Sequence, residues 1–395
     1  MNSRERVQRI LNFEPVDRTL DWEFGYWGGA LNRWYEEGLS RKKGFPRTLS
    51  DGEGVAGPGL HWPIVSFFKD ILRDEDVSDY FNFDRGWDLT NYNCWMEPKF
   101  EKKTIREDEN HKEWIDENGL HKYEYKNGTA MPSFLGWPVS NYKDWEQIKK
   151  ERFQVNFYNR FRKDFKELKK EYKNRDYFLG ILGEPAGFYG SIRMLIGEEN
   201  LLYMFYDNPK LVKDILNYLT DLWIDIGIEL LSNFEIDAIF FWEDMCGKNG
   251  PAISPAMFRE FMTPCYKRII GAMRSRGVNH FIVDNDGNLD IILPLFIECG
   301  FTGIYPIEKQ AGNDLLKMRH KYPKLQIMGG FNKNVLAYNK KAIDLELEDF
   351  KEMISLGGFI PFADHTVPLN SSWDNFKYYR EKLKNIIYNT KVLKK

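Results

Sequence analysis

Two aspartates, one residue apart, follow a short apolar segment in the second half of the chain. Residues 281–283 are aromatic or β-branched and have polar neighbours, which indicates a buried strand. Asp284 and Asp286 come at its carboxyl end, where residues two apart in an extended chain point to the same side. Two carboxylates this close either bind a cation or share a proton, because like charges resist joint ionisation. Alternatively, the segment forms a turn before a helix, with Gly287 supplying a positive φ.

Apolar segments that end in polar residues recur along the chain. They cover residues 19–24, 177–182, 237–242, 279–284, 303–306, 325–330 and 358–361. Helical patterns separate them, and repeated β–α units with apolar strands predict a parallel sheet covered by helices. Because at least six of these strands follow residue 175, the pattern favours a closed α/β fold, the (β/α)8 TIM barrel, over a doubly wound sheet.

A TIM barrel would bring the residues at the strand ends to one face. Active sites of this fold lie at the carboxyl ends of the strands. The polar residues at these ends are Glu23, Glu184, Glu243, Asp244, Asp284, Asp286, Glu308, Asp364 and His365. We expect a substrate pocket that includes Glu243, Asp284 and His365, with Glu184 and Asp286 as further catalytic residues.

Aromatic residues accompany two of these strand ends. The predicted substrate-binding residues are Trp22, Glu23, Phe24, Trp27, Trp242 and Asp244. The aromatic rings could hold an aromatic or quaternary-amine group by stacking or by cation–π contact. The same rings would also serve as packing in the core or under a lid.

Residues 80–140 have a different pattern. Polar and apolar residues alternate there, and Asn-Gly pairs occur at 118–119 and 127–128. Asn-Gly is a strong hairpin signal, so the segment predicts an antiparallel β-meander. We expect a single barrel domain over residues 1–395, with 80–140 as a β-rich insertion or cap.

Composition excludes several classes of function. The 395 residues are 43% hydrophobic, and the net charge of −3 gives no support for non-specific nucleic-acid binding. Four scattered cysteines without a CxxC pair suit a reducing cytoplasm. We identify no secretory signal, no membrane span and no glycine-rich nucleotide loop in a β–α–β setting, so a cytoplasmic protein without NAD or ATP is expected.

Several segments resemble one family of barrel proteins. They are Gly183-Glu184-Pro185, residues 207–212, residues 253–261 with Pro264, Met328-Gly329-Gly330-Phe331-Asn332-Lys333, and residues 358–361 with 364–368. In these segments the chain resembles the uroporphyrinogen decarboxylase superfamily, which also contains the corrinoid-dependent methyltransferases of anaerobes. The resemblance covers essentially the whole chain and implies a (β/α)8 barrel with a deep pocket, and a homodimer.

The resemblance is closer to the methyltransferase branch. True decarboxylases are expected to carry an N-terminal arginine-rich motif that grips substrate carboxylates. The corresponding residues 21–29 contain no arginine and are acidic, which makes them a poor host for a polyanion. A decarboxylase or lyase acting on a tetrapyrrole or other carboxylate is the alternative, and a non-catalytic corrinoid-binding barrel is the second alternative.

The methyltransferases hold zinc with a His-x-Cys-Gly-Asn strand end and a later cysteine. These motifs fall on residues 284–288 and on His365, so the resemblance implies Asp284, Asp286 and His365 as ligands of zinc or another divalent metal. Carboxylates with an imidazole suit a harder metal than thiolates do. We therefore expect methyl transfer from a small methoxy or amine donor to a partner corrinoid protein, rather than thiol activation.

Overall fold

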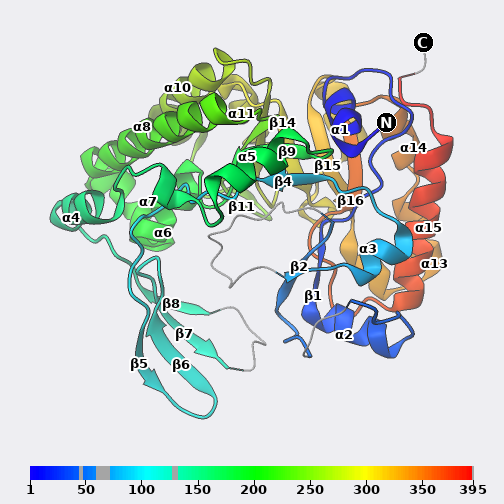
Figure 1. Cartoon of the computed structure of the whole chain (residues 1–395), viewed down its shortest axis with the longest axis horizontal. Coiled ribbons are helices and arrows are strands. Elements are labelled where there is room, and N and C mark those ends of the chain that lie inside the picture. The colour runs from blue at the N-terminus through cyan, green and yellow to red at the C-terminus, as the bar shows by residue number, and fades with distance from the viewer. Residues whose placement is uncertain (44–47, 59–71, 127–131, 394–395) are drawn as a thin grey trace.

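The computed structural model describes residues 1–43, 48–58, 72–126 and 132–393. Seven parallel strands form a curled central sheet in the order β16-β15-β14-β13-β10-β9-β4 (Figure 1). These strands are β4 (Trp87–Leu89), β9 (Phe178–Leu182), β10 (Ala238–Trp242), β13 (His280–Asp284), β14 (Gly303–Ile307), β15 (Gln326–Phe331) and β16 (Phe359–Ala363). The predicted TIM-barrel fold class is therefore confirmed.

An extended segment, residues 19–24, lies between the two edge strands of this sheet. Its Trp22 ring contacts Trp87 of β4 at 4.3 Å and Phe362 of β16 at 4.9 Å between ring centroids. The Thr19 hydroxyl donates to the Phe359 carbonyl at 2.6 Å. The segment was expected to be a strand, but its contacts to the edges are made largely through side chains, so it is extended without belonging to the ladder.

Alternate residues of the strands point into the barrel. The interior cluster consists of Val7, Ile10, Leu11, Leu20, Trp22, Phe24, Trp87, Leu89, Phe178, Ala238, Phe240, Ile282, Tyr305, Met328, Ile360 and Phe362. Because side chains two residues apart share a face, the next inward positions of β10, β13 and β16 belong to Trp242, Asp284 and Asp364. The alternation of residues along these strands thus places two carboxyl groups, those of Asp284 and Asp364, next to the apolar interior cluster at the carboxyl ends of the strands.

Helices pack around the sheet, and the first of them contributes Val7, Ile10 and Leu11 to the interior cluster. They are α1 (Ser3–Leu11), α2 (Gly28–Glu36), α3 (Asp76–Phe81), α4 (Tyr142–Arg152), α5 (Phe165–Lys173), α6 (Phe188–Ile196), α7 (Glu198–Asp207), α8 (Pro209–Asn233), α9 (Pro255–Met257), α10 (Thr263–Arg274), α11 (Leu293–Cys299), α12 (Leu315–Lys321), α13 (Lys340–Glu346), α14 (Phe350–Ser355) and α15 (Trp373–Asn389). A π-helical segment, Phe258–Met262, joins α9 to α10, and 3-10 turns occur at Tyr158–Arg160, Lys309–Ala311 and Lys333–Ala337. Within the described ranges, none of the helices is long and apolar enough to cross a membrane.

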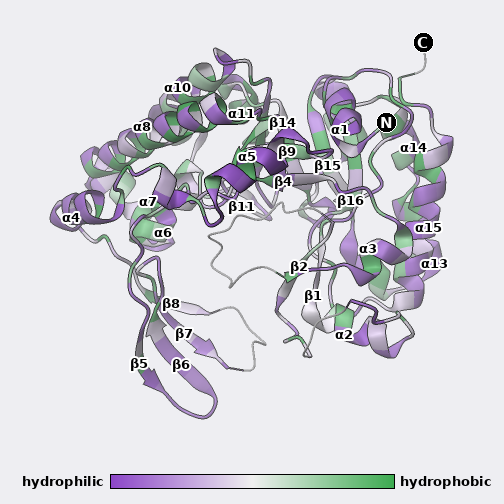
Figure 2. Ribbon diagram, in the orientation of Figure 1, coloured by the Kyte–Doolittle hydropathy of each residue, from purple (hydrophilic) through white to green (hydrophobic). Residues whose placement is uncertain are grey.

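The insertion is a four-stranded antiparallel sheet that projects from the barrel (Figure 1). Its strands are β5 (Lys103–Glu107), β6 (His111–Ile115), β7 (His121–Tyr125) and β8 (Ser133–Gly136), and Figure 2 shows most of their residues as hydrophilic. The expected start at residue 80 is too early, because β4 pairs with β9 in the main sheet. The expected Asn127-Gly128 turn lies outside the described residues.

Short strands complete the fold. β1 (Gly25–Trp27) pairs with β2 (Gly54–Ala56), which also pairs with β3 (Leu72–Arg73). β11 (Cys246–Gly247) and β12 (Gly250–Pro251) form a small hairpin just after β10. An isolated bridge between Tyr26 and Val367 joins β1 to the segment after β16. The connection after β10 is therefore held by its own hairpin, and the connection after β16 is held by its bridge to β1.

Candidate active site

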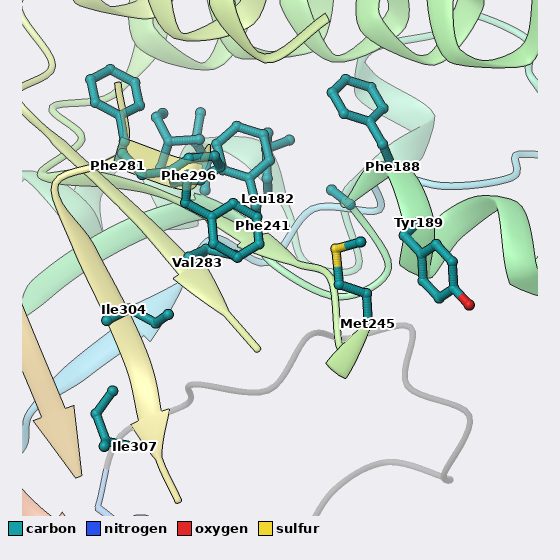
Figure 3. Packing of buried hydrophobic residues seen from close by; sticks show 14 of the residues in the cluster. Leu182, Phe188, Tyr189, Phe241, Met245, Phe281, Val283, Phe296, Ile304 and Ile307 are labelled. Carbon is teal, nitrogen blue, oxygen red and sulfur yellow. The ribbon is translucent and has the colours of Figure 1, made fainter. Parts of the chain in front are cut away.

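Apolar packing fixes the strand that carries Asp284. Phe281 and Val283 of β13 point outward and lie in the same cluster as Phe241 of β10 and Phe296 of α11 (Figure 3). The alternating residues of β13 therefore face the barrel interior, and Asp284 is the last of them. In the parallel register, Trp242 of β10 lies on one side of Asp284 and Tyr305 of β14 on the other.

A buried asparagine holds the turn between the two aspartates. Asn285 donates its backbone N–H to the Tyr305 carbonyl at 2.9 Å, and its side-chain oxygen accepts from the Met245 N–H at 3.0 Å. Its side-chain amide donates to the Asp286 carbonyl at 2.7 Å. Gly287 follows with a φ of 79°, and a side chain there would collide with the Cys246 backbone. The predicted positive φ at Gly287 is thus confirmed, and the turn is clamped to the loop after β10.

Asp284 lies in surroundings that favour its protonated form. Burial raises its pKa well above the ordinary value, and the charges of Asp286, Asp244 and Glu184 raise it further. A hydrogen bond from the Tyr305 hydroxyl opposes this shift. Among the described residues, no cation forms an ion pair with Asp284. The carboxyl group therefore keeps its proton up to a higher pH than an ordinary aspartate does.

Asp286 is also surrounded mainly by acids. Burial raises its pKa well above the ordinary value, followed by the charges of Asp244 and Glu308, while Lys333 lowers it. Its Oδ2 lies 3.8 Å from His365 Nε2, and its buried Oδ1 has no hydrogen-bond partner among the described residues. Burial and the charge of Lys333 lower the pKa of His365 to about 3, so this ring is neutral at neutral pH.

Lys333 brings positive charge to the other side of the acidic cluster. Its ammonium group lies 3.3 Å from Glu308 and 3.8 Å from Asp364, and its backbone N–H donates to Asp364 at 3.0 Å. Burial raises the pKa of Asp364 to about 6, against the lowering by Lys333. Lys333 is not among the predicted site residues, although it ends the motif at residues 328–333.

Glu243 lies beneath this cluster rather than within it. Its side chain is fully buried, and its two carboxylate oxygens accept from the backbone N–H groups of Phe188 and Tyr189 at 2.6 and 2.7 Å. Burial raises its pKa to about 8, against the lowering by these amides. Because both oxygens are engaged at the start of α6, the geometry favours a supporting role for Glu243 over the expected catalytic one.

The predicted substrate-binding residues fall into two groups. Trp22, Glu23 and Phe24 are at most 2% exposed and do not line an open surface: Trp22 and Phe24 pack inside the barrel, and Glu23 is buried against Arg380 of α15. Trp27, Trp242 and Asp244 are half-buried, as are the predicted catalytic residue Glu184 and both aspartates of the pair. His365 retains 29% of its side-chain surface and lies 5.4 Å from the Phe24 ring. The predicted site thus separates into an interior layer and an accessible layer.

The three expected metal ligands do not form a metal-binding arrangement. Asp286 and His365 are neighbours, but no three His, Cys, Asp or Glu side chains among the described residues are placed to hold one ion. Cys246, the cysteine nearest this turn, hydrogen-bonds Asn285, and burial raises its pKa to about 11, which disfavours a thiolate ligand. The residues present therefore do not fit the zinc that the family resemblance implies.

The fold and the acidic strand ends together define a TIM-barrel protein of the α/β class. The chain belongs to the uroporphyrinogen decarboxylase (URO-D) family, whose family model matches residues 119–386, more than half of its length. No curated relative matches the sequence.

Solved structures extend the comparison of folds. A methyltransferase from Methanosarcina mazei has a TM-score of 0.56 at 13% identity, covering 97% of this chain and 99% of that one. A B12-independent methionine synthase from Shewanella sp. has a TM-score of 0.38 at 11% identity, covering 72% of this chain and 75% of that one. Only the first is similar enough for its fold to be compared, and at this identity it shows a shared fold alone.

Proposed function

We propose that the protein transfers a methyl group from a small methoxy or amine donor to a partner corrinoid protein, with the Asp284–Asp286 pair as the proton donor. One observation carries this proposal. Two neighbouring carboxyl groups at the carboxyl end of β13 lie in surroundings that raise their pKa values well above the ordinary range. Perturbed carboxyl groups at the end of a barrel strand are the arrangement expected of a catalytic acid.

The chemistry of such donors requires an acid. When the methyl group leaves, the oxygen or nitrogen keeps the bonding electron pair and is a poor leaving group unless it gains a proton or a positive charge. The Asp284 carboxyl group is held by the Tyr305 hydroxyl, so it can present a proton from a fixed position. Asn285 holds the backbone of Asp286, which keeps the second carboxyl group beside the first. A corrinoid bound to the partner would supply the nucleophile that accepts the methyl group.

Proton donation fits this arrangement better than metal-assisted catalysis does. A divalent cation could polarise the same leaving atom, and it would need three ligands that converge. The described Asp284, Asp286 and His365 do not meet that requirement. The proposal therefore assigns the aspartates the role of acids, with His365 as a neutral neighbour.

The family membership favours a second candidate, decarboxylation of a tetrapyrrole carboxylate. Such a substrate is a polyanion and needs cations that face it. In this structure Arg193 already pairs with Asp244, and Lys333 lies against Glu308 and Asp364. The remaining side chains of the cluster are mainly acidic, and they would repel a polyanion. We therefore expect no coproporphyrinogen formation at a rate typical of enzymes, on the order of 1 per second or faster.

The test is methylation of a cob(I)alamin-loaded partner from a panel of methoxy and methylamine donors. On a donor that the wild type accepts, Asp284→Asn and Asp286→Asn should each lose roughly two or more orders of magnitude in rate. Asp290→Asn, an exposed aspartate in the same turn, is the matched control and should keep its rate. Full activity in both Asp→Asn variants would leave the pair with only a turn-forming role.

A further inference from the structure

Asp244 adopts a backbone conformation that is unfavourable for a residue with a side chain. It has a φ of 43°, in the left-handed region, two residues beyond the end of β10. Such a conformation persists only where the surroundings hold it. The backbone N–H of Asp244 donates to the Asp284 carbonyl at 3.4 Å, and both its carbonyl and its carboxylate contact a helix that packs on the end of β10.

Arg193 of α6 contacts both the backbone and the side chain of Asp244. Its Nη1 donates to the Asp244 carbonyl at 2.9 Å, and its Nη2 donates to Asp244 Oδ2 at 2.5 Å. The guanidinium carbon also lies 4.8 Å from the centre of the Trp242 ring. Two donors on one rigid fork thus fix both the turn and the direction of the carboxylate.

The position of α6 is set by the same end of β10. The Glu243 carboxylate accepts from the first amides of the helix, as described above. Gly190 allows the Trp242 ring to lie against the helix, because a side chain there would come within 2.6 Å of ring atom Cε3. Arg193 follows Gly190 by three residues, so it lies on the same helical face and reaches the residue after Glu243.

The Asp244 carboxylate in turn acts on the proposed acids. Its charge is the largest single charge that raises the pKa of Asp286, and it also raises that of Asp284. The other charged and titratable groups that act on this pair come from Glu184, Tyr305, Glu308, Lys333, Asp364 and His365. Most of them belong to strand ends, as Asp244 does, and the Asp244 carboxylate is held in place by Arg193.

We propose that Arg193 is a positioning residue, which holds the Asp244 carboxylate beside the Asp284–Asp286 pair. Arg193 acts through Asp244 and does not touch the reacting atoms. The proposal rests on the proposed function only for its effect on rate, because the placement of Asp244 can be measured without a substrate.

The first test is structural. In the crystal structure of Arg193→Met, Asp244 should leave the left-handed conformation and its carboxylate should turn away, while Asn285 still holds the Asp284–Asp286 turn. Arg193→Lys keeps a donor and should leave Asp244 closer to its original place. If Asp244 keeps its conformation in Arg193→Met, the proposal is wrong, whether or not the protein transfers methyl groups.

The second test is kinetic and uses the same methyl-transfer assay. Arg193→Met and Asp244→Asn should each lower kcat by about tenfold with little change in KM, and the double variant should be no slower than either single variant, because the two residues act as one unit. Arg193→Lys should recover part of the loss. The control is Tyr189→Phe, which removes the hydrogen bond from Tyr189 of α6 to Glu198 without touching Asp244. Losses that multiply in the double variant, or an equal loss in Tyr189→Phe, would show that Arg193 merely supports α6.

If Arg193→Met does not fold, Asp244→Asn and Arg193→Lys decide between these outcomes. A wild-type rate of methyl transfer in Asp244→Asn would overturn the proposal, because a carboxylate that the reaction does not need requires no positioning. If the wild type accepts no donor at all, the proposed function fails, and the conformation of Asp244 in the Arg193→Met crystal structure decides the positioning role separately.

Discussion

Two pairs of acidic residues with the same spacing occur in this barrel and have opposite surroundings. Asp21 and Glu23 lie in the extended segment 19–24, and Asp284 and Asp286 follow β13. The members of each pair are separated by one residue, and Glu23 and both members of the second pair are predicted site residues. The difference between the pairs shows what decides whether an acid becomes structural or chemical.

The first pair is neutralised mainly by one distant arginine, and Lys384 lies 3.9 Å from the second oxygen of Asp21. Arg380 of α15 donates to Asp21 at 2.5 Å and to Glu23 at 3.0 Å, and the Ala363 N–H donates to the other Glu23 oxygen at 2.9 Å. All three charged side chains are at most 1% exposed. Burial raises the pKa of Glu23, and Arg380 opposes that shift. These groups fix α15 and β16 to the segment 19–24.

The second pair is surrounded mainly by acids, whereas the first pair is hydrogen-bonded to a cation, Arg380. Asp244, Glu184 and Glu308 all raise the pKa of one or both members, and a tyrosine hydroxyl replaces the guanidinium as the direct partner of Asp284. Such a pair retains a proton instead of forming an ion pair. An uncompensated pair costs stability, so its presence at the carboxyl end of the barrel favours a chemical role.

The largest effect should come from breaking the compensated pair. Arg380→Met removes the cation of Glu23 and leaves Asp21 with the more distant Lys384, and it should lower the free energy of unfolding by roughly 3–5 kcal/mol. Urea unfolding at neutral pH measures the change. Lys382→Met, which removes an exposed cation from the same helix, is the control and should change stability little. If Arg380→Met costs no more than this control, Arg380 does not neutralise the pair.

The sequence predicted the strands and their acidic ends well because both are local patterns. Apolar runs such as residues 281–283 identify strands by themselves, and the turn chemistry of Gly287 is visible in the residues around it. The three-residue strand β4 was missed because Trp87–Leu89 offers too short a pattern, and this misplaced the start of the insertion.

The roles of the acids could not be predicted from the sequence because partners decide them. Arg380 lies 357 residues after Glu23 in the chain, and nothing in the segment 19–24 indicates it. Arg193 and Asp244 are 51 residues apart and meet only because α6 packs on the end of β10. Local sequence patterns therefore identify the candidate acids. Contacts that form on folding decide which of these acids pair with a cation and which lie among other acids.

A smaller loss of stability is expected from a substitution at Glu243, because the hydrogen-bond partners of this buried acid are backbone N–H groups. Glu243→Gln replaces one of two acceptor oxygens with an amide group that faces a backbone N–H, so it should cost roughly 1–3 kcal/mol of stability. Thermal and urea unfolding measure this, and Glu260→Gln, at an exposed ion pair with Lys213, is the control. A variant as stable as the control, with methyl transfer lost, would return Glu243 to the catalytic role.

The smallest of these effects, taken per pH unit, concerns the pH dependence of stability at the second pair. The folded protein holds protons on Asp284 and Asp286 at pH values where the unfolded chain, with an ordinary Asp pKa of about 3.8, has released them. Stability contributed in this way is present at low pH and is lost as the pH rises toward the folded pKa values, by at most about 1.4 kcal/mol per pH unit for each group. Asp284→Asn binds no proton in either state, so its stability relative to the wild type should increase as the pH rises.

Urea unfolding of the wild type and Asp284→Asn between about pH 5 and pH 8 measures this difference. Glu243 also titrates in this window, since burial raises its pKa to about 8, but it contributes equally to both proteins and cancels from the comparison. Asp290→Asn should give a curve parallel to that of the wild type. A gap between Asp284→Asn and the wild type that stays constant over the window would mean that Asp284 is ionised in the folded protein. The second pair would then resemble Asp21 and Glu23, and the case for a proton donor at the end of β13 would rest on Asp286 alone.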